Sequence, residues 1–509
     1  MNKKITMAAL IVGATSSMAM AQSDPLRFDP ENFTRQTLFM PDGEEVTYKA
    51  YEGLQYVKNV EDSTYQTLNI YVPEHLADIP RVPILMRTYV GGYMASTAKS
   101  PSPSDATGRA LKEGYVVCIP GSRGSNSTIE CDGKTIYTGT APNGLLDLKA
   151  AVRYLRYNDS LIPGESELIF TDGTSAGGAI SSLLGATGNA PEYEPYLKRM
   201  GAADARDDVF AAICYCPITD LNHADMEYEW LYGCTNTGVR HLNEQQIVIS
   251  EELSAQCPDY INSLGLKDKA GNLITADNYK EFLKTFLIQS AHRALQEGCE
   301  IPDTIGFKFY QDKSGPMGGP GNGPRRGMGL RTDDGRGAPS FGPGNAPRFN
   351  KTSDYVTALD LDKYLSFVAS VTPLKTPPAF DQMGVLIPTP SPENKVFGNK
   401  AGEAANFTEF SLRHRLNDAS AKLDKDMVKR VYLMNPMNFI DNGKSTVAQN
   451  WFIRHGAKDR DTSFLVPINL AVKLENTGKN VDFFLPWNRP HSGDYNLDDL
   501  FNWIVRTLK

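Results

Sequence analysis

Residues 167–178 read ELIFTDGTSAGG, and this stretch decides the fold class. Glu167–Thr171 has the pattern of a short buried strand, and the small residues that follow Ala176 are typical of a tightly packed helix. Between them, residues 173–177 (GTSAG) match G-x-S-x-G, the sharp strand-to-helix turn that exposes a nucleophilic serine. Glycine is needed on both sides because larger side chains would clash with the packed backbone. The stretch predicts Ser175 as a nucleophile, and an ordinary turn serine is the alternative.

Strands and helices alternate on both sides of this turn. Apolar runs bounded by turn residues predict the strands, and apolar residues at helical spacing predict the helices. Such alternation is typical of an α/β fold in which helices cover both faces of a mostly parallel sheet. The expected strands lie within 45–73 and at Val82–Val90, Tyr115–Ile119, Phe210–Cys216, Asn450–Arg454 and Val481–Leu485, with helices at Gly144–Tyr157, Pro467–Leu474 and Leu497–Leu508.

A long insertion interrupts this alternation. It contains two helical segments, Glu244–Leu264 and Ala276–Glu297, without strands between them. Residues 314–349 hold 11 Gly and 6 Pro among 36 residues, too few apolar groups for a core, which predicts a flexible loop. The expected division is 22–221 for the first part of the α/β core, 222–425 for a mainly helical lid, and 426–509 for the second part of the core.

The composition of the 509 residues excludes several classes of protein. With 41% hydrophobic and 22% charged residues, the chain can bury a large core and is not disordered as a whole. Its 52 basic and 60 acidic side chains give a formal net charge of −8, which argues against a nucleic-acid partner because phosphate recognition needs clustered positive charge. After the N-terminus no apolar run reaches the length of about 18 residues that a membrane span needs, so no membrane span is expected. The oligomeric state stays open.

Residues 1–21 have the features of a signal peptide. Two lysines precede an apolar run from Ile5 to about Ala14, and Ala19-Met20-Ala21 forms the small-x-small pattern that signal peptidase recognises. An N-terminal membrane anchor is the alternative, but the apolar run is too short to span a bilayer. The sequence predicts an exported protein, periplasmic or secreted.

Export permits disulfides, and the chain has seven cysteines, an odd number that leaves at least one free. Cys214 and Cys216 lie two residues apart in one expected strand and are not expected to pair with each other. Cys234, Cys257 and Cys299 could supply one bridge. No CxxC pair or His/Cys ligand spacing is present, so we expect no metal and no other cofactor.

A nucleophilic serine needs a histidine base and an acid that orients the histidine. After a strand–turn–helix of this kind, the partners come from loops that follow later strands, in the order Ser, Asp, His. His491 follows the last expected strand and is the favoured base, with His455 as its chief rival. The acid should follow the strand Asn450–Arg454, where Asp459 sits at the expected position. Its neighbour Asp461 can instead face the substrate.

The negative charge that develops on a tetrahedral intermediate needs backbone N–H donors, which form an oxyanion hole. The N–H of Ala176 is one expected donor. Gly91 and Gly92, which follow the strand Val82–Val90, offer the second, because glycine lets the backbone approach the charge closely. The sequence does not choose between Gly91 and Gly92.

Together these motifs resemble the bacterial tannases (tannin acyl hydrolases) of the α/β-hydrolase fold. The resemblance spans the chain after the signal peptide and is carried by the G-x-S-x-G turn, the stretch KDRDT at 458–462, the loop around His491 and the large insertion. Its most specific part is the Asp-x-Asp pair with a histidine 32 residues after the first Asp (491 − 459). The resemblance implies that Ser175, Asp459 and His491 form a catalytic triad.

The resemblance also implies how a galloyl ring is recognised. Asp461 accepts hydrogen bonds from the ring hydroxyls, and the family places a Lys and a Glu of the insertion on the same hydroxyls, for which Lys375 and Glu393 are the best matches. Such a charged set suits three adjacent phenols, because an analogue without them leaves buried charges unpaired. Fungal tannases and related feruloyl esterases resemble a different pattern, with Cys beside both the Ser and the His. Here Thr174 and Pro490 stand at those positions.

The sequence therefore predicts a serine esterase that hydrolyses small aromatic galloyl esters through an acyl-enzyme. A feruloyl or other carboxylic-ester hydrolase on the same scaffold is the nearest alternative. A serine peptidase is less favoured, because no repeat-built propeller that would screen peptides is present. A catalytically silent binding protein that keeps the fold would lack a triad residue, and none is missing.

Overall fold

The computed structural model describes residues 24–233, 240, 242–310, 355–371, 373–381 and 390–509. The predicted signal peptide, the predicted loop at 314–349 and Cys234 lie outside these residues. The centre of the molecule is a nine-stranded sheet in the order β1-β2-β3-β5-β4-β8-β9-β12-β13. Its strands are β1 (Thr34–Phe39), β2 (Glu45–Gln55), β3 (Thr67–Pro73), β4 (Ile84–Arg87), β5 (Val116–Pro120), β8 (Ile169–Thr174), β9 (Ala211–Tyr215), β12 (Asn450–Arg454) and β13 (Asn480–Phe484).

Most of this sheet is parallel. The strands β5, β4, β8, β9, β12 and β13 run in one direction, whereas β1, β2 and β3 form an antiparallel edge. Parallel neighbours require crossover connections, and the helices between the strands supply them. The core helices are α1 (Ala106–Lys112), α2 (Asn143–Tyr157), α3 (Ala176–Ala186), α4 (Glu194–Met200), α12 (Leu465–Asn476) and α13 (Leu497–Leu508).

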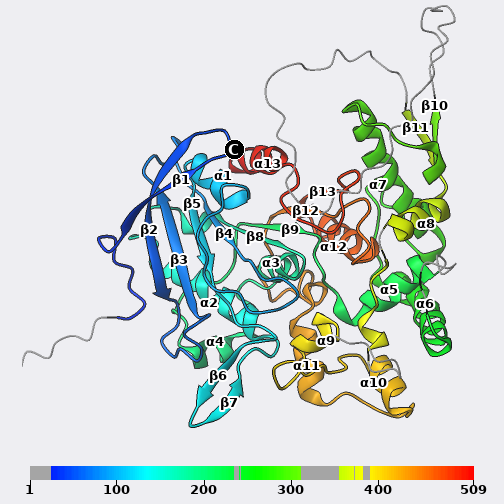
Figure 1. Cartoon of the computed structure of the whole chain (residues 1–509), viewed down its shortest axis with the longest axis horizontal. Coiled ribbons are helices and arrows are strands. Elements are labelled where there is room, and N and C mark those ends of the chain that lie inside the picture. Colours follow the sequence, from blue (N-terminus) through cyan, green and yellow to red (C-terminus); the bar gives the residue numbers. More distant parts are fainter. Residues whose placement is uncertain (1–23, 234–239, 241, 311–354, 372, 382–389) are drawn as a thin grey trace, which may run out of the picture.

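Both faces of the sheet are buried, as the apolar strands require. In β5, Val116 and Cys118 pack into a cluster with residues of α2 and α3, whereas Val117 and Ile119 pack into a second cluster with α1 and α13. This alternation follows from the two-residue period of a strand, and helices cover the sheet from both sides (Figure 1). The predicted fold class, a mostly parallel sheet flanked by helices, is confirmed.

The insertion adds a second group of helices beside the β12–β13 side of the sheet (Figure 1). Two of them, at Glu244–Leu264 and Ala276–Gln296, lie where the sequence places helices. A short antiparallel strand pair, β10 with β11, was not predicted, since strands of four and five residues carry little periodic signal. The elements of this region are α5 (Leu221–Tyr232), α6 (Glu244–Leu264), α7 (Ala276–Gln296), β10 (Phe307–Tyr310), β11 (Tyr355–Leu359), α8 (Leu361–Val371), α9 (Pro392–Val396) and α10 (Glu409–Leu416), followed by α11 (Lys425–Leu433). A small hairpin of β6 (Thr128–Cys131) and β7 (Lys134–Tyr137) lies outside the insertion.

The packing divides the insertion into two parts. Residues of α5 to α8 share an apolar cluster with the loops after β12 and β13, through Ala457, Phe464 and Leu485. Val396 of α9 instead joins the core cluster of α2 and α3, together with Leu433 of α11, a helix that begins where the predicted insertion ends. The two parts therefore frame the carboxyl ends of the parallel strands, where ligands bind in open α/β sheets.

Two further features bear on the sequence predictions. The six cysteines that the structure describes are free thiols. No helix in the described ranges is long and apolar enough to cross a lipid bilayer.

Candidate active site

Ser175 stands on the turn between β8 and α3. The strand extends to Thr174, three residues beyond the expected end, and the residues before it, Ser166–Leu168, form a short 3-10 turn. Ser175 has a φ of 61° and a ψ of −123°, a backbone conformation that is rare for a residue with a side chain. Its N–H donates to the Tyr215 carbonyl at the end of β9 (2.9 Å). The turn thus holds the Ser175 side chain out of the sheet, as in a nucleophile elbow.

The glycines of the turn are required by space. A Cβ added to Gly173 would lie 2.3 Å from the Gly177 carbonyl oxygen, and one added to Gly177 would lie 2.8 Å from the Val90 carbonyl oxygen. Both contacts are with backbone, which cannot move aside as a flexible side chain can. The strand, the helix and the loop after β4 therefore pack more closely here than any other residue would allow.

The structure brings Ser175, His491 and Asp459 into one hydrogen-bonded chain. His491 Nε2 lies 2.8 Å from Ser175 Oγ, and His491 Nδ1 lies 2.8 Å from Asp459 Oδ2. Because a carboxylate only accepts, the Nδ1–H donates to Asp459, which leaves Nε2 to accept the serine proton. The second oxygen, Asp459 Oδ1, accepts the backbone N–H of Asp461 (2.8 Å). This is the geometry that a serine nucleophile needs.

The rival histidine, His455, also lies beside Asp459. His455 is fully buried, its Nδ1 is 3.5 Å from Asp459 Oδ2, and neither ring nitrogen has a hydrogen-bond partner in the described ranges. Burial lowers the pKa of His455, and the Asp459 carboxylate opposes this shift. The position beside Ser175 is held by His491.

The charges of His491 and Asp459 in this hydrogen-bonded chain depend on each other. Burial alone would lower the pKa of His491, but the Asp459 carboxylate raises it above the usual value. Burial alone would raise the pKa of Asp459, but His455 and His491 lower it below the usual range. Asp459 therefore stays ionised and stabilises the imidazolium that forms when His491 takes a proton.

Two glycines let the loops after β12 and β13 pack closely, Gly456 against the backbone of the His491 loop and Gly493 against the side chain of Thr174. A Cβ on Gly456 would lie 2.2 Å from the Arg489 carbonyl oxygen, and one on Gly493 would lie 1.9 Å from Thr174 Oγ1. Gly493 thus brings the His491 loop directly onto the residue before Ser175. No role was predicted for these glycines; Gly493 stands two residues after His491 and Gly456 one residue after His455, and this proximity was the available signal.

The candidate oxyanion donors lie directly after Ser175 in the chain and in the loop after β4, whose Val90 packs against Gly177. Ala176 is the first residue of α3, where helix N–H groups have no partner within the helix. Gly91 and Gly92 follow β4, and Gly92 has a φ of +54° that favours glycine. A Cβ on Gly92 would lie 3.5 Å from Pro392 of α9, so this loop faces the insertion. The choice between Gly91 and Gly92 stays open.

A small pocket adjoins this hydrogen-bonded chain, and the three predicted ring-binding residues line it together. Lys375 Nζ forms an ion pair with Glu393 Oε1, while Glu393 Oε2 is buried with no hydrogen-bond partner in the described structure. Asp461 lies two residues from Asp459, and Ile218 lines the pocket and donates its N–H to the Ser175 carbonyl (3.4 Å). The pocket therefore opens beside the serine.

Burial alone would lower the pKa of Lys375, but the neighbouring Glu393 raises it, so the ammonium keeps its charge. The pocket also contains Asp225 and Thr462, which the sequence analysis missed. Asp225 lies in the middle of α5, and Thr462 Oγ1 is a buried atom without a hydrogen-bond partner in the described part of the chain. An acid within a helix and a threonine after an acidic loop give no distinctive sequence signal.

Three tyrosines of the insertion form hydrogen bonds with the loop that bears Asp459 and Asp461. The hydroxyls of Tyr228, Tyr232 and Tyr364 donate to three nearby carbonyl oxygens of the 457–460 stretch. Tyr228 also accepts the backbone N–H of Lys375 (2.9 Å), so one side chain connects the Lys375 backbone with the loop that bears Asp459. The insertion thus sets the position of both the pocket and the acid.

Two sets of donor atoms lie close enough for a metal ion. One is Cys216, His455 and Asp459, and the other is Asp459, Asp461 and His491, each within 4.8 Å of one another. Asp459 belongs to both sets and already accepts the His491 N–H. Ligation there would break the hydrogen-bonded chain, so the geometry suits proton transfer better than metal binding.

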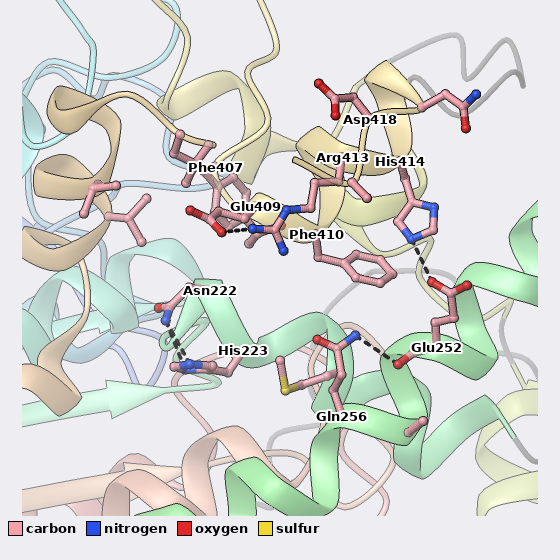
Figure 2. Close-up of a pocket in the computed structure, with 18 residues that line it drawn as sticks. Asn222, His223, Glu252, Gln256, Phe407, Glu409, Phe410, Arg413, His414 and Asp418 are labelled. Atoms are coloured by element: carbon pink, nitrogen blue, oxygen red, sulfur yellow. Dashed lines mark hydrogen bonds and ion pairs between the residues drawn. The ribbon is translucent and has the colours of Figure 1, made fainter. Parts of the chain in front are cut away.

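A larger cavity of about 1000 Å³ lies on the other side of α5 (Figure 2). It is lined by residues of α5, α6, α10 and α11, and four of its charged groups are paired: Arg413 with Glu409, and His414 with Glu252 (2.8 Å). Its lining shares no residue with the hydrogen-bonded chain, whereas Ile218 and Asp461 of the smaller pocket donate backbone N–H groups to Ser175 and Asp459. The chemistry therefore belongs to the smaller pocket.

Comparison with known proteins places this geometry among solved enzymes. The tannase of Fusobacterium nucleatum is 36% identical, with a TM-score of 0.77 over 95% of this chain and 99% of that one. A tannin acyl hydrolase from Lactobacillus plantarum is 34% identical, with a TM-score of 0.78 over 96% of this chain and 100% of that one. A tannin acyl hydrolase in complex with ethyl gallate is likewise 34% identical, with a TM-score of 0.77 over 95% and 99% of the two chains.

Residues 68–258 also match the family model described as BD-FAE. No curated protein sequence matches the chain.

Proposed function

This chain belongs to the bacterial tannases, a family of α/β-hydrolases, and we propose that it hydrolyses galloyl esters with Ser175 as the nucleophile. Its relatives establish it as a carboxylic-ester hydrolase. The observation that carries the residue assignment is the Ser175–His491–Asp459 chain, which lies beside the pocket of Lys375 and Glu393. No other described arrangement joins a nucleophile, a base and an acid next to that pocket.

The acylation step follows from the distances. Ser175 Oγ attacks the ester carbonyl carbon while His491 Nε2 takes the serine proton. The N–H of Ala176, with that of Gly91 or Gly92, stabilises the oxyanion. Collapse of the tetrahedral intermediate breaks the bond to the alcohol, which leaves with the proton that His491 returns. The galloyl group is now esterified to Ser175.

Deacylation repeats these steps with water. His491 takes a proton from a water molecule, whose oxygen attacks the acyl carbon, and the same donors hold the second oxyanion. The bond between the acyl carbon and Ser175 Oγ then breaks. His491 returns the proton to Ser175 Oγ, and gallic acid leaves. Asp459 orients His491 through both steps without taking a proton itself.

Ring selection is assigned to the pocket. Asp461 and Glu393 accept hydrogen bonds from the ring hydroxyls, and Lys375 donates to a hydroxyl oxygen. A ring without hydroxyls would leave the buried Glu393 oxygen and the Lys375 ammonium without new partners, which disfavours its binding. A ferulate ring carries a methoxy group, which has no proton to donate to a carboxylate.

Two measurements test the proposal. In Ser175→Ala, hydrolysis of methyl gallate should fall by at least about 10⁴-fold while the far-UV circular dichroism spectrum stays unchanged. The wild-type enzyme should cleave methyl gallate and methyl protocatechuate much faster than methyl ferulate or methyl benzoate. Unchanged turnover in Ser175→Ala would overturn the mechanism, and a preference for methyl ferulate would overturn the substrate assignment.

Export forms a separate part of the proposal. Residues 1–21 carry the charged, apolar and small-residue segments of a signal peptide. Expression of the full chain in a bacterial host, followed by fractionation and N-terminal sequencing, should give a product that begins at Gln22 outside the cytoplasm. An uncleaved chain that stays in the cytoplasm would contradict export.

A further inference from the structure

The pocket beside Ser175 holds more acidic groups than the predicted trio requires. Three carboxyl groups line it, those of Asp225, Glu393 and Asp461, together with the single ammonium of Lys375. Lys375 is paired with Glu393, and Asp461 lies 3.4 Å from the Arg460 guanidinium. Asp225 has no ion-pair partner among the described residues. An unpaired carboxylate in such a place is strongly disfavoured, and the group keeps its proton instead.

The position of Asp225 directs it toward the pocket. It lies on α5 between Leu221 and Tyr228, at helical spacings of four and three residues, and all three line the pocket. The residue is 8% exposed. Asp225 Oδ2 accepts the backbone N–H of Ala379 (2.7 Å), so one oxygen has its donor and the other, Oδ1, carries the proton.

We propose that Asp225 is a fourth ring-binding residue, which carries its proton at neutral pH and donates a hydrogen bond from Oδ1 to a ring hydroxyl of the ester. This assignment rests on the proposed function, because it takes the galloyl ring to occupy the pocket. It completes a match of donors and acceptors. The carboxylates of Glu393 and Asp461 accept ring O–H groups, whereas Lys375 and the protonated Asp225 donate to ring oxygens.

The charges around Asp225 support this protonation state. Burial raises the pKa of Asp225 to about 8, with the Ala379 N–H and Lys375 opposing and Glu393 and Glu229 assisting. These groups come from every neighbouring element: Glu229 from α5 itself, where it is paired with Arg240, Lys375 from the stretch before α9, and Glu393 from α9. Asp461, with Arg460 beside it, faces the pocket from the loop after β12.

The sign of the pH effect follows. Below pH 8 Asp225 is neutral and donates to the ring, and above pH 8 it loses the donor and adds a negative charge near Glu393. Recognition of the ring should therefore weaken as the pH rises through about 8. The amide of Asp225→Asn keeps an oxygen for Ala379 and a donor for the ring at every pH, so the variant should lack this step.

The kinetic test compares wild type with Asp225→Asn. The kcat/KM of the wild type for methyl gallate is divided by that of Asp225→Asn, which cancels the ionisation of the substrate's own phenols. This ratio should be constant below pH 7 and fall by up to about tenfold per pH unit above 8. Glu227→Gln is the matched control, because Glu227 is a buried carboxyl of the same helix that bonds Asn469 (2.6 Å) and does not line the pocket. The corresponding ratio for Glu227→Gln should stay flat in this range.

A ratio that is flat for Asp225→Asn, or equally steep for Glu227→Gln, would overturn the proposal. If Asp225→Asn fails to fold, infrared spectroscopy on the Ser175→Ala protein provides the second measurement. A protonated-carboxyl band should disappear as the pH rises through 8 and should shift when methyl gallate binds. A protonated-carboxyl band that does not shift when methyl gallate binds would also overturn the proposal. Failure of the galloyl assignment itself would appear separately, as a wild-type preference for methyl ferulate.

Discussion

The two halves of the site are held in different ways. Ser175, His491 and Asp459 stand on loops of the parallel core, where glycines let backbone touch backbone. Lys375, Glu393 and Asp225 belong to the insertion, whose parts are joined to one another and to the core by side-chain hydrogen bonds.

The difference separates rate from selection. The core half offers the same chemistry to any ester that reaches Ser175, whereas the insertion decides which ring stays there. Changes in the core half should therefore lower kcat for every ester. Changes in the insertion half should affect mainly esters with hydroxylated rings, which gives a direct way to break or sharpen the comparison.

The largest effect is expected for Asp459→Asn. The amide cannot hold His491 in the tautomer whose Nε2 accepts the serine proton, so kcat should fall by about 10⁴-fold with little change in KM. The loss should be equal for methyl gallate and methyl benzoate in steady-state assays. A loss confined to methyl gallate would mean that Asp459 belongs to the selecting half.

Gly493→Ala should follow, because the new Cβ would lie 1.9 Å from Thr174 Oγ1 and would push the His491 loop away from Ser175. A displacement of about 1 Å costs on the order of 10²-fold in kcat. Thr174→Gly removes the obstructing side chain, so the double variant should recover most of the activity. If Gly493→Ala loses no activity, or if Thr174→Gly gives no rescue, close packing of the two loops does not position His491.

Lys375→Met tests the selecting half. Glu393 would lose its ion-pair partner, and the ring would lose a donor, so kcat/KM for methyl gallate should fall by about 10²-fold. For methyl benzoate, which offers no hydroxyl to Lys375, it should change by less than about threefold. Equal losses for both esters would show that the insertion also shapes the reacting geometry, and the comparison would need revision.

The sequence predicted the core half better than the selecting half for a physical reason. The turn around Ser175 has a local motif, and chain order alone places candidates such as His491 and Asp459 at the carboxyl ends of the strands. Lys375 and Glu393 came only from the family resemblance, and Asp225 was missed. Their convergence depends on how the insertion packs against the core, and no periodic pattern encodes that packing.

The smallest effect is expected where the two halves meet. Tyr364 of α8 donates its hydroxyl to the Ala457 carbonyl in the loop that bears Asp459. Tyr364→Phe leaves that buried carbonyl without its donor, which should cost about 1–2 kcal/mol in the free energy of unfolding, measured by urea denaturation. Because Asp459 would be held less firmly, kcat should fall a few-fold for methyl gallate and methyl benzoate alike. A reduced stability with unchanged kcat would mean that the insertion stabilises the fold without positioning Asp459, and the two halves of the site would then be independent.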